Sequence, residues 1–218
     1  PDTITTFAER HELGSHTHTH RHLSEVSQAE RRTELESSKE RLEAVSGIDV
    51  TGFRAPSFDF TEDHFELLAD TGYTYDSSVN PCRSIPGWYG GVYETRRPVP
   101  ASSVNPTAPT GLTEVPVAVM PGLGLPLTGT WIRFFGIHYT LLGMNLLARQ
   151  GVAPVLYVHP WELVDLPAVE GVPARVYWRT GDYMRRAVQR ILNAEFEFVP
   201  VGALADAVAA ETGGRPRR

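Results

Sequence analysis

The chain has 218 residues, of which 41% are hydrophobic and 21% charged, with a formal net charge of -6. Such a chain is long enough for one globular domain with a sizeable core, and its mild acidity argues against nucleic acid or an anionic membrane as main partner. The single cysteine, Cys82, excludes an internal disulfide and a thiolate metal cage. The sequence contains no run of about 18 apolar residues, so it predicts no membrane span.

We expect residues 1–212 to form one domain and residues 213–218 a flexible basic tail. No signal peptide is visible, which slightly favours a cytoplasmic location. The compartment and the oligomeric state stay open.

Predicted helices and strands alternate along the chain. Ser27 and Glu30 form a capping box that opens a charged helix, and Gly47 ends it. The sequence further predicts helices near 5–10, 61–71, 131–150, 182–194 and 204–211, strands near 12–16, 50–54, 73–75, 114–120, 155–158 and 196–199, and a long loop over 80–111. This alternation indicates an α/β fold with a parallel sheet, whose site lies in the loops at the carboxyl ends of the strands.

The first of these loops is rich in histidine, with His16, His18, His20 and His22 at alternate positions. All four would share one face of a strand, whereas His16 and His20 would share one face of a helical turn. Two imidazoles and a carboxylate make a common catalytic site for Zn, Co, Ni or Fe. The alternative is a solvated polar loop that is rich in histidine by chance.

Two more segments place chemically active side chains at predicted strand ends. Arg54, followed by Pro56, sits on a rigid turn that would hold its guanidinium over a site, or simply tie down a loop. His159 ends an apolar strand and precedes Pro160 and Glu162. It would serve as a general acid or base, or else be a hydrogen-bonded core histidine.

Taken in order, three motifs resemble the second, third and fifth motifs of the NodB-like polysaccharide deacetylases of carbohydrate esterase family 4: Ser15-His-Thr-His-Thr-His20, Arg54-Ala-Pro56 and Leu156-Tyr-Val-His159. The closer likeness is to the branch associated with bacterial exopolysaccharide gene clusters, on the segments Arg54-Ala-Pro-Ser-Phe58, Tyr75-Asp-Ser-Ser78 and His159-Pro-Trp-Glu162. The resemblance covers most of residues 12–162.

This resemblance implies a distorted (β/α) barrel that hydrolyses N-acetyl groups at one divalent metal ion. By position, it implies that His16 and His20 bind the metal, for which zinc is our first choice and cobalt or nickel are alternatives. It also implies that Arg54 orients a catalytic aspartate and that His159 is the general acid, so that Arg54 and His159 face the cleft that holds the metal pair.

The chain departs from the family pattern at two places. The family's first motif supplies an aspartate base and the third metal ligand, but only Asp2 precedes His16 among the aspartates. We therefore expect a barrel that is incomplete at the N-terminus and a chain with little or no activity. The Asp-Trp motif that tunes the acid is also missing before His159, and either Glu162 or Glu114 would have to replace it.

The function predicted from these features is metal-dependent removal of N-acetyl groups from a polysaccharide or N-acetylated sugar, so a carbohydrate is the expected partner. The alternatives are a related amidohydrolase that opens a small cyclic amide, and a metal-binding or sugar-binding module without activity. His18 and His22 match no family ligand. His11, His64 and His138 are interpreted as structural or surface residues.

Overall fold

The structure is a computed structural model that describes residues 2–85 and 90–213. The chain divides into two compact units. Unit 1 takes in the described residues of 1–79, 97–116 and 199–218, and unit 2 those of 80–96 and 117–198. The predicted single domain stays a prediction. All of the predicted tail except Gly213 lies outside the described residues.

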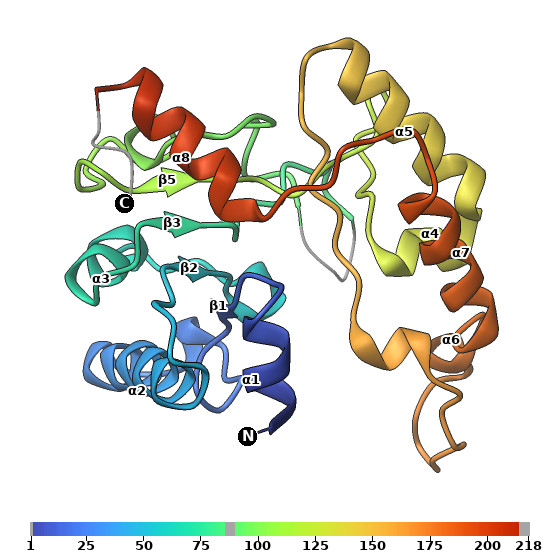
Figure 1. The fold of residues 1–218 in the computed structure, drawn as a ribbon, viewed down its shortest axis with the longest axis horizontal. Helices are drawn as coiled ribbons and strands as arrows, with labels where there is room; N and C mark the ends of the chain where they lie inside the picture. Colours follow the sequence, from blue (N-terminus) through green and yellow to red (C-terminus); the bar gives the residue numbers. More distant parts are fainter. Residues whose placement is uncertain (1, 86–89, 214–218) are drawn as a thin grey trace. The chain divides into compact units, whose positions relative to one another are not determined.

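Unit 1 is built on a five-stranded sheet with the order β1-β2-β3-β5-β4. Figure 1 labels β1, β2, β3 and β5. The strands are β1 (Gly14–Ser15), β2 (Gly52–Phe53), β3 (Tyr75–Asp76), β4 (Val99–Pro100) and β5 (Thr113–Glu114). β1, β2, β3 and β5 are parallel, and β4 pairs with β5 in the antiparallel sense. The predicted α/β class with a mostly parallel sheet is confirmed.

The described residues of unit 1 form the helices α1 (Asp2–Ala8), α2 (Gln28–Ser46), α3 (His64–Asp70) and α8 (Val201–Glu211). The predicted capping box opens α2, where the Ser27 side chain accepts a hydrogen bond from the Glu30 N–H and Glu30 accepts one from Ser27 N–H. Gly47, with φ of 73°, ends the helix because glycine adopts this left-handed conformation without strain.

The core of unit 1 lies between the sheet and these helices. Leu35 of α2, Phe65 of α3 and Phe53 of β2 are almost fully buried in it. α2 packs against β1 and α3, and α8 packs against β4 and β5. This packing fixes the strand ends from which the candidate site residues project.

Several predicted elements differ from the structure. The strand predicted over 114–120 is only β5, which ends at Glu114, and the helices predicted near 5–10 and 204–211 begin earlier, at Asp2 and Val201. The helix expected from Thr61 begins at His64. The segment expected to be a structureless loop contains β4, whose Pro100 pairs with Thr113. Proline has no N–H to donate, and a strand that contains it is tolerated at the edge of a sheet, which is where β4 lies.

Unit 2 is mainly helical, with α4 (Gly129–Phe135), α5 (Ile137–Arg149), α6 (Ala174–Tyr177) and α7 (Asp182–Leu192). The one helix predicted over 131–150 is broken at Gly136, which has φ of 85°. The predicted strand over 155–158 makes only an isolated parallel bridge, between Thr128 and Tyr157. The strand predicted over 196–199 does not form.

Single 3₁₀ turns complete the structure at Leu23–Glu25, Pro56–Phe58, Ala101–Ser103 and Pro160–Leu163. Within the described residues, no helix combines the length and the apolar character that a membrane span requires.

Candidate functional site

The two histidines predicted as metal ligands lie together in unit 1. β1 ends at Ser15, and the next residue is His16. Thr17 and His20 adopt left-handed backbone conformations, with φ of 64° and 61°. This turn brings the rings of His16 and His20 edge to face, with their centroids 5.0 Å apart.

The hydrogen bonding of His16 suits a metal ligand. Its Nδ1 lies 2.6 Å from the carbonyl oxygen of Arg54. Since a carbonyl oxygen only accepts, Nδ1 carries the proton and the lone pair lies on Nε2. Such a bond commonly fixes the ring of a metal-binding histidine. The Thr17 hydroxyl is buried and has no hydrogen-bond partner in the described part of the chain, so a water or ion bound here would satisfy it.

The other two histidines of the loop do not join this pair. His18 has an exposed side chain. His22 turns to Ser57, with its Nε2 3.0 Å from Ser57 Oγ, and to Glu25. Across residues 2–85 and 90–213, no three His, Cys, Asp or Glu side chains gather closely enough to hold a metal ion. The pair therefore offers two protein ligands.

The carboxylate of Glu34 on α2 forms hydrogen bonds with residues 16–22, the histidine loop. Glu34 Oε2 accepts hydrogen bonds from the backbone N–H groups of His18, at 2.8 Å, and Thr19, at 2.7 Å. Its Oε1 accepts one from the Thr19 hydroxyl at 2.5 Å. Burial alone would raise the pKa of Glu34, but these hydrogen bonds outweigh it and lower the pKa below its usual value. The buried carboxylate is therefore charged at neutral pH.

Arg54 follows β2 and is partly buried. Its Nε donates to the Ser77 carbonyl oxygen at 2.8 Å, and its Nη2 donates to Ser77 Oγ at 2.6 Å. Ser77 Oγ in turn donates to the carbonyl oxygen of Val115, just beyond β5. These bonds tie the end of β2 to the segments that follow β3 and β5, so the predicted orienting residue lies at the carboxyl edge of the sheet.

A buried acidic cluster lies at the ends of the neighbouring strands. Asp76 of β3 accepts hydrogen bonds from Ser78 Oγ at 2.6 Å and lies 2.9 Å from His64 Nε2. Burial opposes the charge of Asp76, yet His64 and the other partners lower its pKa. For Glu114, burial and then the charge of Asp76 raise the pKa well above its usual value. Of the two carboxyl groups, Glu114 therefore keeps its proton to the higher pH.

In unit 2, the His159 ring lies between the side chains of Tyr157 and Glu162. Its Nε2 is 2.5 Å from the Tyr157 hydroxyl, and its Nδ1 is 3.6 Å from Glu162 Oε2. The backbone N–H of His159 also donates to Glu162 Oε2, at 2.9 Å. The His159 side chain is 37% exposed, so a substrate can reach the ring, whereas Glu162 is fully buried.

Glu162 forms a buried ion pair with Arg133 of α4, whose Nε donates to Glu162 Oε1 at 2.8 Å. Burial would raise the pKa of Glu162, but its contacts with His159 and the Arg133 guanidinium outweigh it and lower the pKa. Close approach to α4 requires a glycine at 129, where a Cβ atom would overlap the Glu162 carboxylate. An anion is thus held beside the Nδ1 of His159.

Between the two acids that the sequence left open as neighbours of His159, the geometry favours Glu162. Glu114 lies in unit 1 and accepts a hydrogen bond from the Val79 N–H. Sequence reasoning missed Glu34 and Arg133, because each contacts its site across many intervening residues. No local sequence pattern marks either residue; their burial in the structure is the signal, because charged residues are rarely buried unless they are paired.

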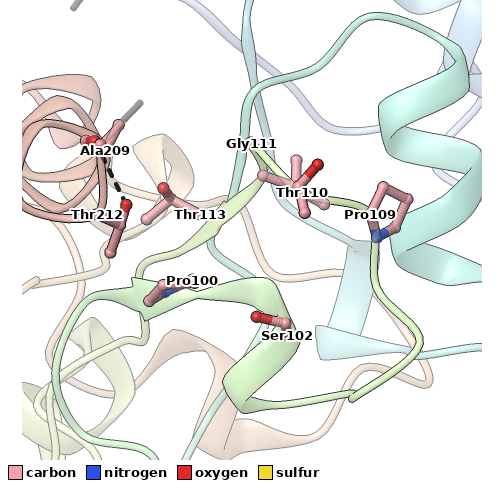
Figure 2. A pocket seen from close by; sticks show the side chains of 10 residues that line it. Pro100, Ser102, Pro109, Thr110, Gly111, Thr113, Ala209 and Thr212 are labelled. Atoms are coloured by element: carbon pink, nitrogen blue, oxygen red, sulfur yellow. Dashed lines mark hydrogen bonds between the residues drawn. The ribbon is translucent and has the colours of Figure 1, made fainter. Parts of the chain in front are cut away.

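A cavity of about 480 Å³ in unit 1 lies elsewhere (Figure 2). Its lining includes Pro100 of β4, Ser102 of the turn after it, Thr113 at the start of β5 and Thr212 at the end of α8. His16 and Arg54 follow the carboxyl ends of β1 and β2, so the cavity borders the opposite edge of the parallel sheet. None of its described lining residues is titratable, and we therefore do not assign the acid–base chemistry to it.

Comparison with known families identifies the chain. Residues 77–206 match the family described as Domain of unknown function (DUF3473), and residues 1–75 match the family described as Polysaccharide deacetylase. The chain belongs to the DUF3473 family and carries part of a polysaccharide deacetylase domain. The deacetylase part supplies β1, β2 and the histidine loop, while the DUF3473 part supplies β4, β5 and His159.

Solved structures share the fold of this DUF3473 protein. A candidate polysaccharide deacetylase from Mycobacterium smegmatis matches with a TM-score of 0.64 and 23% identity, over 100% of this chain and 70% of that one. A second, a probable polysaccharide deacetylase from Pseudomonas aeruginosa, matches with a TM-score of 0.60 and 16% identity, over 100% of this chain and 65% of that one. Puue allantoinase matches with a TM-score of 0.59 and 18% identity, over 96% of this chain and 63% of that one. No curated protein matches the sequence.

Proposed function

We propose that the protein hydrolyses N-acetyl groups of a polysaccharide or N-acetylated sugar, releasing acetate and leaving an amine on the sugar. The observation that carries this proposal is the pairing of His16 and His20 after β1, with His16 Nδ1 bound to the Arg54 carbonyl oxygen. The polysaccharide deacetylase match over residues 1–75 includes both histidines and Arg54. A polysaccharide made by an exopolysaccharide gene cluster is the substrate class that the sequence resemblance favours.

His16 and His20 would hold one divalent metal ion, with zinc as first choice. Such an ion would polarise the acetyl carbonyl and lower the pKa of a bound water. Two neutral imidazoles leave positions for water and substrate, but they provide no carboxylate to offset the charge of the ion. The proposed role of Arg54 is to orient a carboxylate base. Its guanidinium is prepared for this role by the two bonds to Ser77 that fix its plane.

His159 would be the acid that protonates the departing amine, because an amine leaves poorly unless it is protonated. Glu162 supports this role by placing negative charge 3.6 Å from Nδ1, which stabilises an imidazolium. Arg133 keeps that carboxylate ionised and in place. The Tyr157 hydroxyl occupies Nε2, so the amine either displaces this hydroxyl or receives its proton through it.

Opening of a small cyclic amide is the second candidate, since Puue allantoinase shares the fold. A metal-binding or sugar-binding module without activity is the third, because no third protein ligand joins the histidine pair among the described residues.

An acetate-release assay on chitin oligosaccharides with added Zn²⁺, alongside an allantoin assay, separates these candidates. We expect metal-dependent acetate release at a low rate, because no described residue is assigned as the carboxylate base. Positioned general-base catalysis is typically worth about 10²–10⁴-fold. The His16→Ala, His20→Ala variant and the His159→Ala variant should lose this release. Turnover of allantoin alone would favour the cyclic amide, and no turnover of either substrate would favour the binding module.

A further inference from the structure

Glu34 of α2 contacts the histidine loop in a way that neither the family motifs nor the sequence pattern assigns. The residue is 8% exposed although it carries a charge. Each of its carboxylate oxygens accepts from the loop: Oε2 from two backbone N–H groups and Oε1 from the Thr19 hydroxyl. A buried charge is costly unless it is paired or hydrogen-bonded. These hydrogen bonds therefore offset the cost of burying the Glu34 carboxylate.

The same helix also holds the residue that precedes His16. Ser38 lies one helical turn after Glu34, and its Oγ accepts a hydrogen bond from Ser15 Oγ at 2.9 Å. Glu34 and Ser38 share one face of α2, because residues at i and i+4 lie above one another on a helix. Through these two residues, α2 forms hydrogen bonds with the chain on both sides of His16.

The backbone that Glu34 holds is strained. Thr17 and His20 flank His18 and Thr19, and both have positive φ values. Non-glycine residues in this region are strained, and they persist only where the surroundings enforce them. The bonds from the N–H groups of His18 and Thr19 to Glu34 supply that constraint. Without them, the turn would relax and the two imidazoles would separate.

We propose that Glu34 is a positioning residue, which sets the Thr17–His20 turn so that His16 and His20 converge on one metal ion. This inference rests on the proposed function, since it takes the two histidines as metal ligands. Glu34 itself would not touch the metal. It would act through the backbone, so its hydrogen-bond geometry would matter more than its charge.

Titration calorimetry with Zn²⁺ on metal-stripped chains of residues 1–218 tests the proposal through four variants. Glu34→Leu keeps the size but removes all three bonds, and we expect a loss in affinity of about 10–100-fold, as for other residues that orient metal ligands. Glu34→Gln removes the charge but keeps an acceptor for the two N–H groups, and it should retain most of the affinity. Glu36→Gln makes the same charge change at an exposed position of α2 and should bind as the unmodified chain does.

Thr19→Val provides a milder variant in case Glu34→Leu does not fold. It removes the hydrogen bond that the Thr19 hydroxyl donates to the Glu34 carboxylate but leaves the two backbone N–H bonds, and a loss of about fivefold is expected. Thermal unfolding of the metal-free chains checks that each variant is folded at the titration temperature.

Equal Zn²⁺ affinity of Glu34→Leu and the unmodified chain would overturn the role of Glu34. Equally weak binding by Glu34→Gln and Glu34→Leu would also overturn it, because charge rather than position would then be responsible. If the unmodified chain itself does not bind Zn²⁺, the proposed metal site fails, and the role of Glu34 fails with it. The titration of the unmodified chain alone therefore distinguishes the two failures.

Discussion

In unit 1, the loop that carries His16 and His20 follows a strand of a parallel sheet, and Glu34 holds it through backbone N–H groups. In unit 2, His159 follows a segment with an isolated bridge, and the buried Arg133–Glu162 pair stands beside its side chain. The backbone of the loop thus positions His16 and His20, whereas a buried charge pair lies beside His159. Backbone support suits ligands that must converge on one point, whereas a charge beside the ring suits a residue that gains and loses a proton.

The largest expected effect comes from breaking the buried ion pair of unit 2. Arg133→Met removes the guanidinium and leaves the buried Glu162 carboxylate without the cation of its ion pair. Removing one partner of a buried pair typically costs about 3–5 kcal/mol, and we expect a loss of that order. Urea unfolding followed by tryptophan fluorescence measures it, because all four tryptophans lie within residues 88–178.

The double variant Arg133→Met, Glu162→Leu is the control for this prediction. It replaces both charges by apolar side chains, and such replacements are often close to neutral. It should therefore recover part of the lost stability, although not the part that comes from the bonds of Arg133 to the backbone carbonyl oxygens of residues 175, 176 and 178. A double variant as unstable as Arg133→Met alone would show that the pair does not act through its charges.

A smaller effect is expected from crowding the sheet of unit 1. Gly52 of β2 is buried, and a Cβ atom there would overlap the ring of Tyr75 on β3. Gly52→Ala should cost about 1–3 kcal/mol, as overpacking usually does. Gly14→Ala, at the position paired with Gly52, would meet only ordinary contacts and should change stability little. Urea unfolding followed by circular dichroism compares the two, and equal stabilities would contradict the packing described for β2 and β3.

The smallest effect concerns the pH dependence of unit 1. Burial and Asp76 raise the pKa of Glu114 in the folded chain. A raised folded-state pKa contributes stability that is complete below the unfolded-state pKa and is lost as pH rises through the folded value. Glu114→Gln cannot ionise, so its melting temperature should fall less between mildly acidic and mildly alkaline pH than that of the unmodified chain. Parallel melting curves over that range would contradict the assignment of the proton to Glu114.

Local signals in the sequence were sufficient for several parts of the fold. Ser27, Glu30 and Gly47 bound α2 as predicted, because capping depends on neighbouring residues. The ends of β1 and β2 were also expected near His16 and Arg54. The spacing of His16 and His20, together with the family resemblance, was enough to propose the pair, although their role as ligands stays a prediction.

Other parts depend on tertiary contacts that no local pattern reveals. Glu34 lies 15 residues from Thr19, and Arg133 lies 29 residues from Glu162, so only the folded chain brings them together. β4 was missed because prolines flank Val99, and a proline-rich segment is typical of a loop. The break at Gly136 was missed because the apolar pattern continues through it into α5.

Titration of the metal-stripped chain with Zn²⁺ tests the central claim most directly, namely that the loop after β1 holds a divalent metal through His16 and His20. We predict one bound ion per chain, loss of this binding in the His16→Ala, His20→Ala variant, and its retention in the matched His18→Ala, His22→Ala variant. Equal affinity of the unmodified chain and the His16→Ala, His20→Ala variant would contradict the claim.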